Sequence, residues 1–346
     1  MPNIPAPSAP TTRVRLGGPE EIVAAVPHLL GFHPRESVVA IGLRGRRSRV
    51  CVSLRFDLPA RASEPDLAAL VADHLRTARA SAAIVLILTE EPAPDGTLPR
   101  PELAGVIDAA LAAARIGVRD LLCVHDGRWW SYVCDEPDCC PPEGRPVPRE
   151  APSLLVAATV ADGQVVHQNR DDLVATVAPV ARVDDGERRE RFAAAERRLA
   201  DRPVPAIERT NVLGAIEATI RSRVEADRPL DGDEVARFCV ALGEVEVRDA
   251  CLRWLDGPLA DAAEGLWREL TRSALPPYAA SPATLLALYA YARGDGTLAR
   301  ICADRALGED PGYTMAHLVH ESLDRGLPPA AIRELASCVD VVGADG

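Results

Sequence analysis

The sequence predicts an α/β N-terminal domain, built on a mixed, largely parallel sheet, followed by an all-α, tetratricopeptide-like helical domain. Strand-like runs alternate with helical spacing over residues 13–182, which is typical of strand–helix–strand units. After residue 184, helical spacing continues to the C-terminus without a convincing strand pattern. A chain of 346 residues accommodates two domains of ordinary size.

The helices and strands of the first half follow from the spacing of their apolar residues. Apolar residues recur at helical spacing over residues 19–30, 64–80, 100–116, 153–161 and 171–178. Strand patterns cover residues 37–43, 49–56, 84–88, 118–125 and 164–167. The run 84–88 is apolar without interruption, which indicates a central strand that is covered on both faces.

Two further segments have distinctive compositions. Residues 1–12 are rich in proline and alanine, and we expect them to be a disordered tail. Residues 183–203 are dense in glutamate and arginine, which predicts a charged, solvated helical linker. The helical domain then spans residues 204–346, and Pro203 and Pro205 mark the boundary at which we expect the two halves to be separable.

Residues 280–313 match the pattern of one tetratricopeptide-like repeat, in which small residues let two antiparallel helices pack closely. Ala299 and Ala306 occupy the close-packing positions, and Asp310-Pro311 ends the second helix. Solenoids usually need at least about three repeats for stability, so a helical scaffold and a partner-binding groove are both open alternatives. The single clear repeat favours the scaffold.

The composition excludes several classes of function. The chain has no lysine, so it cannot form a Schiff base with pyridoxal phosphate or supply a P-loop lysine. A net charge of −12 argues against nucleic acid as a general partner. No apolar run is long enough for a membrane span, and the N-terminus lacks a signal-peptide pattern. We therefore expect a cytoplasmic protein whose nine cysteines are thiols.

Three cysteines, Cys134, Cys139 and Cys140, follow a tryptophan-rich stretch. The spacing of Cys134 and Cys139 suits two ligands of a tetrahedral zinc ion, although adjacent cysteines seldom bind the same ion. Further ligands would have to come from elsewhere in the fold, from Cys123, His125 or His33. We therefore predict no cofactor and interpret the loop as a reduced structural element of packed thiols. A zinc site and a reactive thiol are the alternatives.

The stretch before the cysteines alternates its side chains between two faces, as a strand does. Trp129 lies on one face, whereas Arg128, Trp130 and Tyr132 share the other. If the sheet has an open face, this Arg–Trp–Tyr row is a stacking platform for a planar ligand or a partner. If helices cover both faces, both tryptophans belong to the core. We place the candidate binding surface on the face of Trp130.

An enzyme is the alternative to a binding protein. His33 and Ser37 lie in a loop between a helix and a strand, but neither a nucleophile elbow nor an identifiable acid accompanies them. With Asp126, Arg128 and the cysteine-containing loop that begins at Cys134, they would form a site at one edge of the sheet. We favour a binding or regulatory module with a protein partner or a small planar ligand, and we expect neither nucleic acid nor a membrane as partner.

Two motifs carry a resemblance to a known family. The letters GFHP at residues 31–34 precede SVV at 37–39, and GRWWSY at 127–132 precedes a cysteine at 134 and CCPPEG at 139–144. Over nearly its whole length the chain resembles an uncharacterised actinobacterial family known only as a domain of unknown function. The resemblance implies a cytoplasmic actinobacterial protein, and it brings no activity, cofactor or site residue with it.

Overall fold

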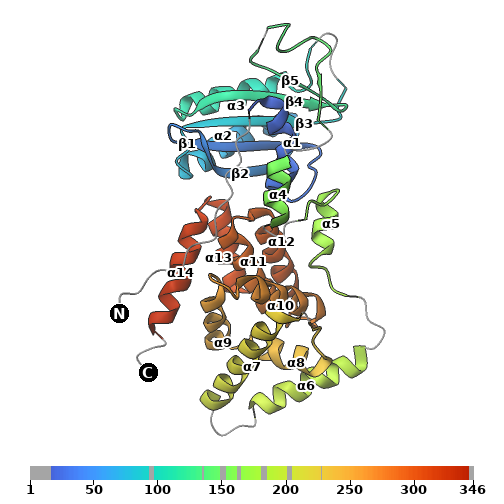
Figure 1. Cartoon of the computed structure of the whole chain (residues 1–346), viewed down its shortest axis with the longest axis vertical. Coiled ribbons are helices and arrows are strands. Elements are labelled where there is room, and N and C mark those ends of the chain that lie inside the picture. Colours follow the sequence, from blue (N-terminus) through green and yellow to red (C-terminus); the bar gives the residue numbers. More distant parts are fainter. Residues whose placement is uncertain are drawn as a thin grey trace. The chain divides into compact units, whose positions relative to one another are not determined.

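The structure of the chain is a computed structural model that describes residues 17–92, 97–134, 136–148, 153–161, 165–180, 185–200, 205–226 and 228–342. The chain divides into two compact units, Met1–Arg170 and Asp171–Gly346 (Figure 1). The tail expected over residues 1–12 lies outside the described residues. Because most of the boundary expected near Pro203 and Pro205 also lies outside them, the predicted domain limits stay a prediction.

In its described residues the first unit combines one six-stranded sheet with four α-helices and a 3₁₀ turn. The strands are β1 (Ser37–Arg44), β2 (Arg49–Asp57), β3 (Ala82–Leu88), β4 (Gly117–His125), β5 (Arg128–Ser131) and β6 (Arg145–Pro146). The helices are α1 (Pro19–Leu30), η1 (Arg61–Ser63), α2 (Glu64–Thr77), α3 (Pro101–Ala113) and α4 (Ser153–Ala161). The order of strands across the sheet is β2-β1-β3-β4-β5-β6.

The sheet is mixed, as expected, but the expectation that it is largely parallel is wrong. Among the described strands, β3 and β4 form the single parallel pair, and the other neighbouring pairs are antiparallel. The hairpin β1–β2 explains the difference. Because β2 runs back along β1, the helix α2 that follows β2 leads into a strand antiparallel to β1. A second hairpin reverses the chain between β4 and β5.

The core of the first unit lies between the sheet and helices α2 and α3, which pack against each other. Their apolar side chains form one cluster with Val38, Val85 and Leu121 of the sheet. Val39 and Leu86, which alternate with these residues, are equally buried, so both faces of the sheet are covered. The central position of β3, expected from its apolar run, is confirmed.

The short strand expected over residues 164–167 is wrong. In the described part of this segment, His167 forms an isolated parallel bridge with Phe32. The backbone N–H of His33 donates to the His167 carbonyl over 3.1 Å, and the N–H of His167 donates to the Gly31 carbonyl over 2.8 Å. The segment therefore closes the loop after α1 instead of adding a strand to the sheet.

The described part of the second unit is helical and contains no strand, in agreement with the sequence. Its helices are α5 (Arg170–Ala175), α6 (Asp185–Ala200), α7 (Pro205–Glu225), α8 (Gly232–Ala241), α9 (Val245–Ala250), η2 (Cys251–Trp254), α10 (Ala260–Ser273), α11 (Ala280–Arg293), α12 (Gly296–Glu309), α13 (Thr314–Asp324) and α14 (Pro329–Val342). None of the described helices combines the length and the apolar composition that crossing a membrane requires.

Helix α6 corresponds to the segment for which the sequence predicts a solvated linker. It packs against α8, and Phe192 on α6 is buried. The Phe192 ring stacks on Tyr278, with ring centroids 4.8 Å apart. Helix α6 is therefore packed within the second unit, and one of its charged side chains takes part in this packing, because Arg188 Nη2 donates to the Ser273 carbonyl over 2.7 Å.

Helices α11 and α12 form a closely packed pair around the turn at Gly294 and Asp295. The turn uses Gly294 in the left-handed region, at a φ of 97°, and the Asp295 carboxylate accepts a hydrogen bond from the N–H of Leu298 over 2.9 Å. Ala299 and Ala306 are fully buried, as small residues at a helix contact must be. The helix pair is thus present, and its membership of the tetratricopeptide class stays a prediction.

Candidate functional site

The structure does not join His33 and Ser37 into a catalytic pair. The Ser37 hydroxyl is fully buried, donates to the Arg35 carbonyl over 2.6 Å and accepts from Arg55 Nε over 2.8 Å. His33 is exposed, and no described hydrogen bond connects its ring to Ser37. The hydroxyl therefore anchors the start of β1 and is not free to act as a nucleophile.

Asp126 lies at the tip of the β4–β5 hairpin, together with Gly127. Both residues have positive φ, 46° for Asp126 and 69° for Gly127, as a two-residue type I′ turn requires. The Asp126 side chain is exposed and forms no described hydrogen bond with His33 or Ser37. A turn therefore explains this residue, and the sheet-edge site predicted for an enzyme is not assembled from these three residues.

The side chains of Arg128 and Trp130 support the cysteine loop, which we define as residues 134–144. Arg128 donates from Nε to the Glu143 carbonyl over 2.6 Å and from Nη2 to the Gly144 carbonyl over 2.8 Å. Trp130 Nε1 donates to the Pro142 carbonyl over 3.0 Å. A Cβ atom on Gly144 would lie 2.3 Å from the Trp130 ring, so only glycine fits there. Much of the expected stacking platform is thus occupied by the loop itself.

The two faces of β5 differ as the alternation predicts. Trp129 is 2% exposed, whereas Trp130 is half-buried. Tyr132, on the face of Trp130, directs its hydroxyl inward and donates to the Pro99 carbonyl. Burial, followed by the nearby Cys123 thiol, raises the pKa of Tyr132 above its ordinary value. The role of the Arg–Trp–Tyr row as a ligand surface stays a prediction.

The three cysteines of the loop converge. The Sγ atoms of Cys134, Cys139 and Cys140 all lie within 4.8 Å of one another. Cys139 and Cys140 occupy one tight turn, because both of their N–H groups donate to the Glu136 carbonyl, over 3.0 and 2.7 Å. The turn therefore allows two adjacent cysteines to direct their thiols to one point. Cys123, His125 and His33, the other ligands considered from the sequence, do not belong to this group of described residues.

The environment of Cys140 favours a neutral thiol in the absence of a cation. The pKa of Cys140 is raised to about 12, and burial is the largest cause, followed by a hydrogen bond with Cys134. The backbone of Ser131 opposes this shift, and Cys139 adds to it. Three thiolates at this spacing would repel one another strongly. A positive charge between them would remove that penalty.

Sequence reasoning missed a buried charge network in the first unit. Arg100, at the start of α3, forms ion pairs with Glu64 over 2.8 Å and with Glu91 over 2.5 Å. Its Nη1 also donates to the Pro59 carbonyl over 3.0 Å. These contacts join α2, α3 and the segment after β3, so the network holds the fold together. No spacing rule could reveal it, because the partners lie far apart in the sequence.

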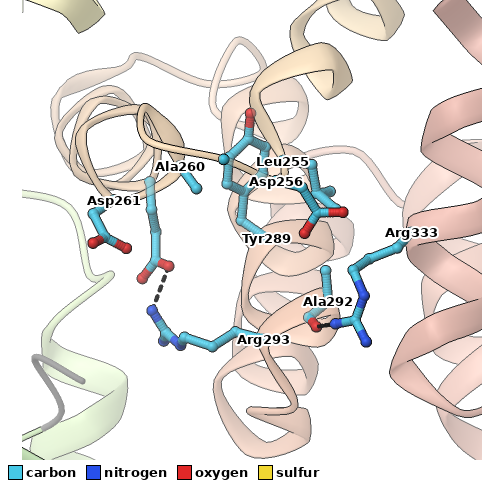
Figure 2. A pocket seen from close by; sticks show the side chains of 10 residues that line it. Leu255, Asp256, Ala260, Asp261, Tyr289, Ala292, Arg293 and Arg333 are labelled. Atoms are coloured by element: carbon cyan, nitrogen blue, oxygen red, sulfur yellow. Dashed lines mark hydrogen bonds and ion pairs between the residues drawn. The ribbon is translucent and has the colours of Figure 1, made fainter. Parts of the chain in front are cut away.

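Sequence reasoning also missed a cavity of about 190 Å³ in the second unit (Figure 2). Its lining comes from the segment between η2 and α10, from the first turns of α10, from the last turn of α11, and from α14. The lining residues are Leu255, Asp256, Gly257, Ala260, Asp261, Glu264, Tyr289, Ala292, Arg293 and Arg333. Five of these ten carry a formal charge and the others are mostly apolar, so the cavity combines charged groups with apolar surface.

The charges around this cavity are only partly compensated. Glu264 is buried and accepts from Arg268 over 2.9 Å and from Arg293 over 2.5 Å. Asp256 and Asp261 are exposed and form no ion pair with another described residue. Arg333 donates Nη1 to the carbonyl of Ala292 and likewise has no acidic partner among the described residues. Two carboxylates and one guanidinium group therefore remain available to a ligand.

The comparisons with known proteins reveal one family. The family model described as "Domain of unknown function (DUF4192)" matches residues 19–330, which includes the cysteine loop and the cavity-lining residues other than Arg333. No curated protein and no solved structure matches the chain.

Proposed function

The chain belongs to the DUF4192 family, whose description names no activity, and we propose from its geometry that it is a binding and regulatory protein. Its helical unit holds a small ligand. The ligand carries a net positive charge and a carboxylate, as a basic amino acid does. The uncompensated charge of the cavity is the observation that supports this proposal. Figure 2 shows Asp256 and Asp261 at its border, with Arg333 on the neighbouring helix.

Charge complementarity defines this ligand class. Arg333 has free N–H donors that suit a carboxylate, because the guanidinium fork matches its geometry. Asp256 and Asp261 suit an ammonium or guanidinium group. Glu264 and Asp295 are paired with Arg268 and Arg293. Among the remaining charged groups of the lining, two negative groups face one positive group, so a ligand with one excess positive charge balances the cavity.

The size of the cavity fits one amino acid. A volume of about 190 Å³ corresponds to roughly six water molecules at about 30 Å³ each. Drug-sized pockets are larger, roughly 300–1,000 Å³. Because the cavity joins α14 to α10 and α11, a bound ligand would connect these helices and favour one arrangement of them. Such a coupling is the physical basis of the regulatory role that we propose.

Isothermal titration calorimetry of the full chain tests the proposal with L-arginine and agmatine, which lacks the carboxylate. We expect L-arginine to bind more tightly than agmatine. Arg333→Met should weaken L-arginine binding by about tenfold and leave agmatine binding unchanged. Asp261→Asn should weaken the binding of both compounds. Matched controls in the first unit, Arg119→Met and Asp108→Asn, should change neither affinity.

Two results would refute this function. One is a failure of both compounds to bind at millimolar concentration. The other is tighter binding of L-glutamate than of L-arginine, because the excess negative charge of the cavity disfavours an anion.

We also propose a cytoplasmic location and, through the helices of the second unit, a protein partner. The cysteines whose side chains the structure describes are free thiols, which supports a reducing compartment. The net charge of −12 supports neither a nucleic acid nor an anionic membrane as partner.

A further inference from the structure

The spacing of the loop thiols fits a single metal ion. In a tetrahedral zinc site the Zn–S bonds are about 2.3 Å, which places the sulfur atoms about 3.8 Å apart. The Sγ atoms of Cys134, Cys139 and Cys140 lie within 4.8 Å of one another, so each pair has to approach by at most about 1 Å to reach that spacing. A [4Fe–4S] cluster fits less well, because each cysteine would bind a different iron and the sulfurs would have to lie farther apart.

The loop holds the three cysteines in place before any ion binds. Arg145 donates from Nε to the Cys139 carbonyl and from Nη2 to the Asp138 carbonyl, each over 2.6 Å. On the other side of the loop, Arg128 and Trp130 bind the carbonyls of residues 142–144. These contacts reduce the conformational entropy that the loop loses on binding an ion. They also give the loop a structure that does not depend on the metal.

The electrostatics of the loop suit thiolates that surround a cation. Three thiolates around a divalent ion leave a net charge of −1, and the Arg145 guanidinium, which is bonded to the Cys139 carbonyl, offsets that charge. Among its described residues the same loop carries three exposed carboxylates, Glu136, Asp138 and Glu143. These groups attract a cation from solution, while the thiolates select a soft one.

We propose that Cys134, Cys139 and Cys140 bind one thiophilic divalent ion of the Zn²⁺ type through three thiolates, a site independent of the cavity proposed above. As the three metal–sulfur bonds form, three thiol protons pass to the solvent. Among the described residues no fourth His, Cys, Asp or Glu joins the group. We assign the fourth tetrahedral position to water or to an incoming ligand, which would make the ion exchangeable rather than purely structural.

Metal titration of the full chain tests the site. The protein is reduced with a non-thiol reductant and titrated with Zn²⁺, and with Cd²⁺, whose bonds to thiolates absorb in the ultraviolet. We expect one ion per chain. Each of Cys134→Ser, Cys139→Ser and Cys140→Ser should lower the affinity by at least about 100-fold, because each removes one of three thiolates. Cys51→Ser, which changes a half-buried thiol of β2 outside the loop, should leave both affinity and stoichiometry unchanged.

The fluorescence of Trp130 supplies a second readout. Because its indole N–H binds the loop at Pro142, Zn²⁺ should change the fluorescence of the chain, and Trp130→Phe should remove that change but retain one bound Cd²⁺. Binding that survives in a variant with all three cysteines replaced would overturn the proposal, as would the absence of any binding. A disulfide between Cys134 and either neighbour in protein purified without reductant, together with no metal uptake after reduction, would identify a redox pair instead.

Discussion

The cysteine loop and the helical cavity are opposite kinds of candidate site. The thiols of the loop come from one segment, residues 134–140, and local turns bring them together. The charged groups of the cavity come from Asp256, Asp261 and Arg333, which only the packing of separate helices brings together. The first kind of site can be recognised from the spacing of cysteines in the sequence. No sequence pattern indicates the second kind. The loop also lies outside the core of its unit, whereas Glu264, which lines the cavity, is a buried residue of the second unit.

The largest effect that we predict is a difference in stability between variants of the sheet and of the cysteine loop. Trp129→Ala should lower the free energy of unfolding by about 3–5 kcal/mol, because Trp129 is 2% exposed and its loss leaves a cavity. Trp130→Ala should cost about 1 kcal/mol, since this ring is half-buried and supports only the loop. Urea denaturation followed by circular dichroism measures both values. Equal, severe losses would mean that the loop is part of the core.

A second prediction concerns the cavity. Glu264→Gln should lower the free energy of unfolding by about 2–3 kcal/mol, because it removes the charge that compensates Arg268 and Arg293 next to the core. Glu217→Gln, which breaks a more exposed pair with Arg221 on α7, should cost at most about 0.5 kcal/mol. Thermal unfolding of the two variants checks the difference. Equal effects would show that the ion pairs of Glu264 contribute no more to stability than an ion pair on a surface helix.

A third prediction distinguishes the two sites by pH. Because the pKa of Cys140 is raised to about 12, binding of a metal must displace its proton throughout the neutral range. The Zn²⁺ affinity of the loop should therefore rise at least about tenfold per pH unit between about pH 6 and 8, and fall as the pH falls. Ligand binding in the cavity should change little, because carboxylates and guanidinium groups keep their charge over that range. Parallel titrations at several pH values test both statements.

Much of the secondary structure could be predicted because its signals are local. Helix α4 spans residues 153–161 as expected, and the β1–β2 hairpin follows from two alternating runs around an arginine-rich turn. The alternation along β5 correctly assigned Trp129 to the buried face. Each of these signals depends on residues within a few positions of one another, so the chain carries it without reference to the rest of the fold.

The candidate sites also could be predicted only as far as local sequence signals allow. The sequence by itself indicated that Cys134, Cys139 and Cys140 are unusual, but only the structure showed that the turn at Cys139 and Cys140 brings their thiols close to that of Cys134. The sequence placed Arg128 and Trp130 on one face, and the folded loop then covered them.

Only the tertiary structure decided the direction of the strands, the packing of α6 on α8 and the cavity at Arg333. The physical reason is common to all three. Helix and strand patterns arise from neighbours along the chain, whereas strand order and the partners of charged side chains arise from contacts between distant segments. Such contacts become favourable only when the whole unit closes, so no short stretch of sequence contains them.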